Sequence, residues 1–296
     1  MSVDEVLAAH RGRGREFTAA GVRSFVLDEG RSDAEPVVCL HGVPASSFVY
    51  RAVLPELARR GLRGIAFDLP GLGLAARPDD FDYSWTGLGR WATAALDALG
   101  MDRVHLVVHD IGGPVGFEIA AAAPDRVRSL LLLNTVVAVD TFRRPWVMEP
   151  FAHRSLGRAW LTAAGVPVVF RTLMRTIGVG PSVPAAELDA HLRLLLGDDS
   201  GRAFLRIMRS FERTTEKRRR YETVVGSGAY PVGLLWGSKD PALPLRTYGV
   251  QARLAARLDH IPSVPGKHFL QEDFPDEIAA AVAALAQADG RKTGER

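Results

Sequence analysis

The chain has 296 residues, 47% of them hydrophobic and 24% charged, and its formal net charge is +3 at pH 7. Such a composition predicts a soluble globular chain with a sizeable core. The basic residues are spread out and no run of about 18 apolar residues occurs, so neither a nucleic-acid partner nor a membrane span is expected. The single cysteine, Cys39, excludes a disulfide framework, and with no signal-like N-terminal stretch we expect a cytoplasmic protein.

The first part of the chain alternates predicted strands with predicted helices. Strands are expected at residues 22–27, 36–40, 64–68, 104–108 and 129–133, and helices at residues 48–60, 86–99 and 112–123. This alternation is typical of a mostly parallel sheet with helices on both faces. The sequence therefore predicts the class α/β.

The alternation ends at about residue 136 and resumes at about residue 231. The segment between contains several helical stretches interrupted by Gly and Pro, which predicts an inserted helical lid. Later elements are expected as strands at residues 231–236 and 259–264 and helices at residues 245–258 and 275–288. We therefore expect a core domain made of residues 1–135 and 231–296, with a lid at residues 136–230.

Residues 104–117 carry the functional prediction. An apolar, β-branched run ends at His109-Asp110 and is followed by Gly112, Gly113 and an Ala-rich segment, a pattern that predicts a strand, a sharp turn and a helix. Such a nucleophile elbow presents one side chain at the carboxyl edge of a parallel sheet. Here that residue is Asp110, where most elbows carry serine. A carboxylate can attack an electrophilic saturated carbon and form an alkyl ester; the alternative is a simple helix N-cap.

Two further acid–base candidates follow predicted strands. Asp240 comes just after the strand at residues 231–236, and His268 just after the strand at residues 259–264. Ligand sites of open α/β sheets lie at the carboxyl ends of strands, and the order nucleophile, acid, histidine is that of a hydrolase triad. We therefore expect His268 to take a proton from water, and Asp240 to hold its tautomer and stabilise the imidazolium.

The turn at residues 41–44 follows a buried strand and is the expected second half of the site. The backbone N–H groups of Val43 and of Ile111, next to the nucleophile, are expected to form an oxyanion hole for the ester intermediate. His41 and His109 are expected to support these turns through hydrogen bonds. His41 is also a candidate for substrate contact.

Several motifs together resemble the branch of the α/β-hydrolase family that contains epoxide hydrolases and haloalkane dehalogenases. They are His41-Gly42-Val43-Pro44, Asp68-Leu69-Pro70-Gly71-Leu72-Gly73, Val107-Val108-His109-Asp110, Trp236-Gly237-Ser238-Lys239-Asp240-Pro241 and His268-Phe269-Leu270-Gln271-Glu272-Asp273. The resemblance spans nearly the whole chain outside the lid. It implies the α/β-hydrolase fold and a triad of Asp110, His268 and Asp240.

The motifs divide between the two members of this branch. Val107-Val108 and residues 269–273 look more like dehalogenases. Dehalogenases of the family, however, usually hold halide with a Trp after the nucleophile and commonly an Asn after the His-Gly pair. This chain has Ile111 and Val43 there, and neither side chain donates a hydrogen bond. The loss of two donors would destabilise the departing halide by about 1.5 to 3 kcal/mol for each donor. The sequence therefore predicts that the usual halide site of dehalogenases is absent.

An epoxide needs a lid donor that protonates the ring oxygen as the ring opens. In the related epoxide hydrolases a tyrosine does this, and Tyr221 falls at about the right distance after the nucleophile. Trp160 or Trp146 could be a second donor through the indole N–H, and both are candidates for substrate contact. The alternative for each of these aromatic residues is packing against the core domain.

The first prediction is therefore an epoxide hydrolase that acts through an alkyl-enzyme ester on Asp110, and the second is a haloalkane dehalogenase. Ester or lactone hydrolysis and a non-enzymatic small-molecule receptor are further alternatives. No metal is expected, because the histidine spacing does not suit zinc. No cofactor is expected, because residues 71–73 lack the third glycine of a dinucleotide site. The expected partner is a small-molecule substrate, and the expected state is monomer or homodimer.

Overall fold

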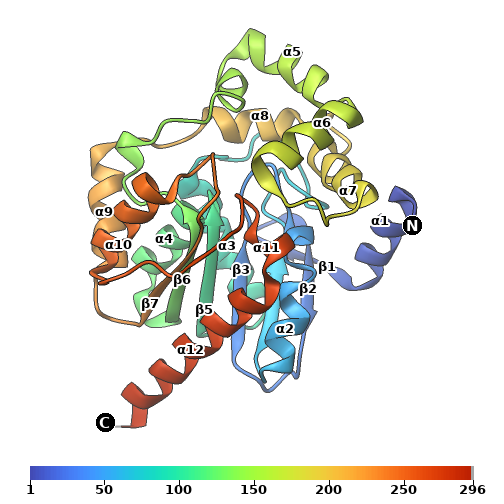
Figure 1. Ribbon diagram of the computed structural model, residues 1–296. Helices are drawn as coiled ribbons and strands as arrows, with labels where there is room; N and C mark the ends of the chain where they lie inside the picture. Colours follow the sequence, from blue (N-terminus) through green and yellow to red (C-terminus); the bar gives the residue numbers. More distant parts are fainter. Residues whose placement is uncertain (295–296) are drawn as a thin grey trace.

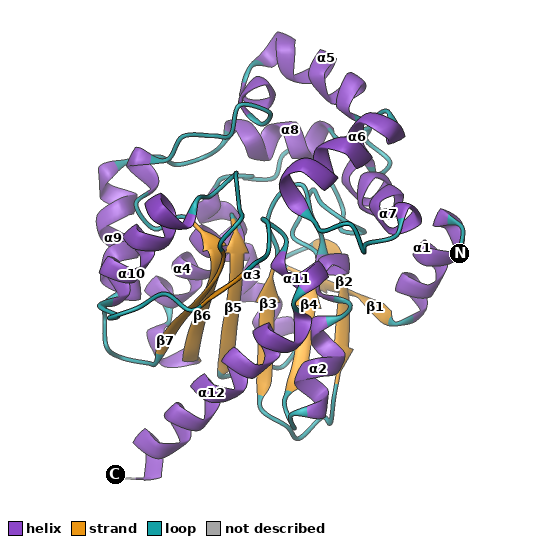
Figure 2. Cartoon of the chain, in the orientation of Figure 1, coloured by secondary structure: helices purple, strands orange, loops and turns teal. Residues whose placement is uncertain are grey.

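The computed structural model describes residues 1–294 and contains an eight-stranded sheet in the order β1-β2-β4-β3-β5-β6-β7-β8 (Figures 1 and 2). Its strands are β1 (Gly14–Ala19), β2 (Val22–Glu29), β3 (Pro36–Leu40), β4 (Arg63–Phe67), β5 (Val104–Asp110), β6 (Val127–Thr135), β7 (Val232–Gly237) and β8 (Ser263–Val264). Strand β2 pairs antiparallel with both β1 and β4, whereas every pairing from β4 to β8 is parallel. The predicted α/β class is confirmed.

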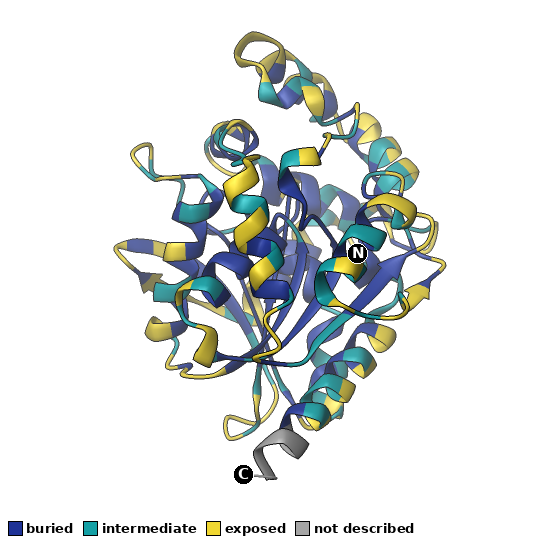
Figure 3. Ribbon diagram, turned by 90° about the vertical axis from the view of Figure 1, so that its left-hand side faces the viewer, coloured by how far each residue is buried: buried dark blue, intermediate teal, exposed yellow. Residues whose placement is uncertain are grey.

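Helices cover both faces of this sheet. Helices α2 (Val53–Arg59) and α12 (Pro275–Gly294) pack on one face, and α3 (Trp85–Ala98), α4 (Gly112–Ala122) and α10 (Val250–Ala256) lie on the other (Figure 2). Strands β5 and β6 are buried along nearly their whole length, as parallel strands covered on both sides must be. In Figure 3 the central strands are accordingly dark blue, while exposed positions lie on the outer sides of helices and in loops.

The connection from β6 to β7 holds five helices: α5 (Arg154–Ala164), α6 (Pro167–Leu173), α7 (Ala185–Leu196), α8 (Arg202–Arg209) and α9 (Thr215–Val225). Helices α5 to α8 lie beyond the carboxyl ends of the strands, at the top of Figure 1, where a lid would lie. Helix α9 instead packs against α4 and α10 beside the sheet. This difference decides the position of Tyr221.

Several local elements differ from the sequence prediction. Helix α1 (Val3–Gly12), which packs against α7, and the edge strand β1 were not predicted. The expected helix at residues 48–60 is interrupted: a 3-10 turn precedes α2. The expected strand at residues 259–264 is only the two-residue β8, and α11 (Leu270–Asp273) follows it. No helix within residues 1–294 is long and apolar enough to cross a bilayer.

Candidate active site

Asp110 ends β5 at a sharp turn into α4. Its φ angle is 52°, in the left-handed region that residues other than glycine rarely adopt. Its carbonyl oxygen accepts a hydrogen bond from Thr135 Oγ1 at 2.6 Å, which ties the turn to β6. A Cβ atom at Gly42 would collide with the Asp110 side chain, and one at Gly113 would collide with Thr135. The small residues on both sides of Asp110 therefore allow the turn to form.

The three residues predicted as a triad lie together at the carboxyl edge of the sheet. His268 Nδ1 is 2.9 Å from Asp240 Oδ2, and His268 Nε2 is 3.6 Å from Asp110 Oδ2. His268 and Asp240 are buried, and Asp110 is half-buried at the base of a cavity. This is the arrangement of a nucleophile, a base and an acid that orients the base.

Four hydrogen bonds hold the Asp240 carboxylate. Its Oδ1 accepts from the backbone N–H groups of Ala242 at 2.7 Å and Leu243 at 3.1 Å. Its Oδ2 accepts from His268 and also from Asn134 Nδ2 at 2.6 Å. Asn134 was not predicted as a site residue, although its position directly after the strand predicted at residues 129–133 was a usable signal.

The charges of the triad are mutually dependent. Burial opposes a charged His268, but the charges and hydrogen bonds of Asp240 and Asp110 outweigh it and raise the pKa of His268 to about 10. Burial likewise opposes both carboxylates, yet His268 keeps the pKa of Asp110 and of Asp240 below the ordinary value. The two carboxylates therefore favour the protonated form of His268 in the resting site, and His268 favours the ionised form of both.

The two oxygens of Asp110 have different neighbours. Oδ1 accepts a hydrogen bond from the backbone N–H of Val43 at 2.8 Å, and Oδ2 lies toward His268. A carboxylate bound in this way keeps one oxygen in a backbone donor site while the other is available for attack. Ile111 lines the cavity beside the nucleophile, and the role of its N–H as a second donor stays a prediction.

The cavity above Asp110 lies between the edge of the sheet and the helices of the β6–β7 connection. Nearly all of its wall is aliphatic, aromatic or Met side chains. Among the described residues that line it, the side chains with strong hydrogen-bonding groups are Asp110, His268, Trp85 and Arg144, and none is a tyrosine. In residues 1–294 no group of three or more His, Cys, Asp or Glu side chains is placed to hold a metal ion.

Trp85, at the start of α3, was not predicted as a site residue. It is only 2% exposed, and its indole Nε1 has no hydrogen-bond partner among the described residues. Its ring packs on Phe211, with centroids 5.0 Å apart. Helices α3 and α4 pack side by side, and Trp85 lines the same cavity as Ile111 and Pro114 at the start of α4. The cavity that Asp110 lines is thus also lined by a buried indole whose N–H has no partner among the described residues.

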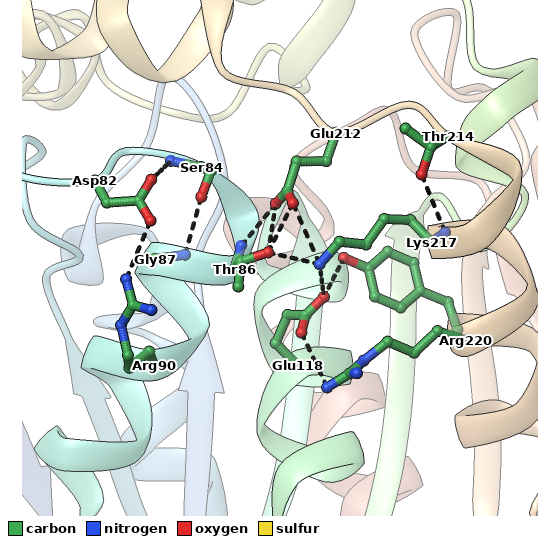
Figure 4. Close-up of polar contacts among 11 residues, drawn as sticks. Asp82, Ser84, Thr86, Gly87, Arg90, Glu118, Glu212, Thr214, Lys217 and Arg220 are labelled. Carbon is green, nitrogen blue, oxygen red and sulfur yellow. Dashed lines mark hydrogen bonds and ion pairs between the residues drawn. The ribbon is translucent and has the colours of Figure 1, made fainter.

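The prediction that Tyr221 is the lid donor is wrong. Tyr221 is fully buried outside the cavity, and its hydroxyl donates to Glu118 Oε1 on α4 at 2.8 Å. Figure 4 shows the surrounding network, in which Lys217 and Arg220 also contact Glu118. Sequence distance from the nucleophile could not reveal that α9 packs against α4 and α10 of the core, away from the cavity.

The other residues predicted to contact substrate also lie outside the cavity. Trp160 Nε1 already donates to the Val147 carbonyl at 2.8 Å, and Trp146 is 77% exposed outside the cavity. His41 is fully buried, with Nδ1 3.0 Å from the Gly42 carbonyl while Nε2 accepts from the Leu69 N–H at 3.0 Å. It supports its turn and does not line the cavity.

The sheet and the elbow define an α/β-hydrolase with a carboxylate at the nucleophile position. The family model described as alpha/beta hydrolase fold matches residues 35–163. The chain is 32% identical over 281 residues to haloalkane dehalogenase 2 of Mycobacterium tuberculosis (strain ATCC 25618 / H37Rv), covering 90% of this chain and 93% of that relative. It therefore belongs to the α/β-hydrolase family, in the branch of haloalkane dehalogenases and epoxide hydrolases, and is a hydrolase.

Solved structures show the same fold. Haloalkane dehalogenase DbeA from Bradyrhizobium elkani USDA94 superposes with a TM-score of 0.77 at 22% identity, covering 94% of this chain and 99% of that one. The epoxide hydrolase CorEH superposes with a TM-score of 0.73 at 20% identity, covering 93% and 98%. Both members of the branch thus share the overall arrangement, and the choice between them depends on the residues of the cavity.

Proposed function

We propose that the protein hydrolyses carbon–halogen bonds at saturated carbon through an alkyl ester on Asp110. The observation that carries the proposal is the carboxylate itself: Oδ1 is bound by the Val43 N–H, and Oδ2 lies beside His268 below an apolar cavity. An apolar wall suits a haloalkane, and a carboxylate nucleophile suits displacement at saturated carbon. The haloalkane dehalogenase relative supports the same chemistry.

The reaction has two steps. Asp110 Oδ2 attacks the carbon that bears the halogen, the carbon–halogen bond breaks, and the halide leaves with the bonding electrons. Once the ester has formed, His268 releases its proton to solvent. The neutral ring then takes a proton from water, and the resulting hydroxide attacks the carbonyl carbon of the Asp110 ester. The Val43 N–H stabilises the charge on Oδ1 in the tetrahedral intermediate, which collapses to an alcohol and the Asp110 carboxylate. The net products are alcohol, halide and a proton.

The identity of the leaving group depends on the donors that the cavity offers. Epoxide opening needs a proton donor at the ring oxygen, and the tyrosine on which that prediction rested, Tyr221, lies outside the cavity. A departing halide needs hydrogen-bond donors and no proton transfer. The free Nε1–H of Trp85 is such a donor, and it supplies from α3 what Ile111 cannot supply from the elbow. These features favour the halide.

The test combines product analysis with trapping. Bromide release from bromoalkanes and diol formation from epoxides are measured with the same enzyme, and we expect bromide release to dominate. The variant His268→Gln should stall after the first step, so that mass spectrometry finds the Asp110 peptide heavier by the alkyl group. Diol formation from epoxides without halide release from bromoalkanes would contradict the proposal and favour an epoxide hydrolase. Direct transfer of labelled solvent oxygen to the product in the first turnover would exclude the ester.

A further inference from the structure

The cavity wall contains one cation besides the triad histidine. Arg144 is the single Arg or Lys side chain among the described residues that line the cavity, and its side chain is 5% exposed. It lies in the connection from β6 to α5. Its Cζ is 4.9 Å from the Phe211 ring centroid, and Trp85 packs on that same ring. A buried cation in an otherwise apolar wall requires an explanation, because burying a charge is costly unless the charge is paired.

The protein pairs this guanidinium incompletely. Nη2 donates to the Met208 carbonyl at 2.8 Å, but Nε has no hydrogen-bond partner among the described residues. The carboxylate within ion-pair range, Glu149, is 3.8 Å from Nη1 and is itself 49% exposed to solvent. A long pair with a half-exposed carboxylate contributes little compensation.

The surrounding electrostatics point in the same direction. Burial is the main cause that lowers the pKa of Arg144, and the positive charge of Arg213 adds to it, while Glu149 opposes both. Arg213 is held nearby through a hydrogen bond from Nη1 to the Phe142 carbonyl at 3.3 Å. Because an arginine stays protonated, this end of the cavity has a positive potential that an anion would neutralise.

We propose that Arg144 binds a carboxylate of the substrate, so that the substrate class is a halogenated carboxylic acid. This inference rests on the proposed function. The halogen-bearing carbon lies at Asp110, the halide at Trp85 and the carboxylate at Arg144, and the apolar wall contacts the carbon chain between them. Arginine suits this role because its planar guanidinium binds carboxylates through two parallel hydrogen bonds.

The experiment compares two substrates that differ in charge, ω-bromohexanoate and bromohexane, in the parent and in Arg144→Met. We expect the parent to prefer ω-bromohexanoate in kcat/KM. Arg144→Met should lose that preference by about tenfold to a hundredfold, mainly through a raised KM for ω-bromohexanoate, so that turnover of ω-bromohexanoate falls more than that of bromohexane. The matched control is Arg143→Met, which removes the same charge from the exposed neighbouring residue outside the cavity and should keep the preference.

Binding of an unreactive ligand separates this inference from the proposed function. Hexanoate binding is measured by calorimetry at constant ionic strength, with bromide as a second ligand. Binding of hexanoate that depends on Arg144 supports the carboxylate site even if neither bromide-releasing substrate is turned over, a result that would overturn the proposed function alone. Turnover of bromohexane without Arg144-dependent binding of hexanoate would overturn this inference alone. Arg144-dependent binding of bromide but not of hexanoate would also overturn it, by assigning Arg144 to the leaving halide.

The fold of each variant is checked by thermal melting. Arg144 holds the Met208 carbonyl and contacts Phe211, so Arg144→Met can lose stability. Arg144→Lys keeps the positive charge but loses the planar guanidinium that can donate two parallel hydrogen bonds. Arg144→Gln keeps an N–H donor but loses the charge. We expect the lysine variant to keep part of the preference for ω-bromohexanoate and the glutamine variant to lose it. Equal preferences in these two variants would overturn the proposal.

Discussion

Asn134 Nδ2 donates to Asp240 Oδ2 at 2.6 Å, the same oxygen that lies 2.9 Å from His268 Nδ1. Asn134 is in turn fixed, because its Oδ1 accepts from the Gly237 N–H at 2.8 Å. The Asn134 side chain, at the carboxyl end of β6, therefore sets the orientation of the Asp240 carboxylate after β7. Since the two neighbouring strands share their carboxyl edge, this contact links two positions more than 100 residues apart in the chain.

Replacing Asn134 with Ala should reduce turnover without abolishing it. The variant loses one of four hydrogen bonds to Asp240, and a hydrogen bond to a charged group contributes about 1.5 to 3 kcal/mol, or about tenfold to a hundredfold in rate. Asp240→Asn should cost more, about ten-thousandfold, because it disturbs the histidine tautomer. Steady-state bromide release from all three proteins checks the order. Equal rates for Asn134→Ala and the parent would show that Asn134 only supports the turn.

The two chemical steps should respond differently to pH. Alkylation needs an ionised Asp110, whose pKa lies below the ordinary value, and needs no base. Ester hydrolysis needs neutral His268, which in the resting enzyme is protonated below its pKa of about 10. Ester formation removes the negative charge of Asp110, so the pKa of His268 falls in the intermediate. The burst of bromide should persist toward acidic pH. In contrast, kcat should rise with pH to a plateau, and the midpoint of this rise should lie below pH 10.

Quenched-flow measurement of the bromide burst and of the steady-state rate separates these steps. A burst rate and a kcat that share one midpoint would contradict this division of roles, because both steps would then depend on the same ionisation. His268→Gln provides the control, since its burst should remain while its steady-state rate is lost.

The sequence was sufficient for the fold class and for the placement of Asp110, Asp240 and His268. Apolar runs that end in polar residues locate the carboxyl edge of a parallel sheet, and the triad follows from this rule. The edge strand β1 was missed because its sequence lacks an apolar run. Its buried and exposed positions also alternate irregularly, so the sequence shows no two-residue period. Trp85 and Arg144 were missed because only tertiary packing determines which side chains of a helix or a connection line a cavity.

Tyr221→Phe should affect stability and leave chemistry nearly unchanged. The hydroxyl is buried and bonded to Glu118, and its removal leaves that carboxylate with Lys217 and Arg220. The loss of one such hydrogen bond should lower the free energy of unfolding by about 1 to 3 kcal/mol. Urea unfolding and bromide release check both expectations. Tyr230→Phe, which loses a buried bond to the Val224 carbonyl, is a matched control. A collapse of turnover at unchanged stability would show that Tyr221 takes part in the reaction.

Trp85→Phe should affect the chemistry. Phenylalanine keeps an aromatic ring against Phe211, but it removes the second ring of the indole together with the Nε1–H, which has no partner among the described residues. The smaller side chain should lower the free energy of unfolding through lost packing and not through a lost internal hydrogen bond, and halide departure loses a donor. We expect the rate of the bromide burst to fall by about tenfold to a hundredfold.

Trp91 offers a control on the same helix for the same chemical change. It is buried to the same degree as Trp85, but its Nε1 donates to the Ala19 carbonyl at 3.0 Å, and it lies outside the cavity. Trp91→Phe should thus lower stability by a similar loss of packing plus about 1 kcal/mol for the lost hydrogen bond, and leave the bromide burst unchanged. A donor kept unpaired in the free protein contributes nothing to folding, so the pair of variants separates its role in the reaction from packing. A normal bromide burst in Trp85→Phe would show that Trp85 does not assist the departure of the halide. That result would favour another leaving group.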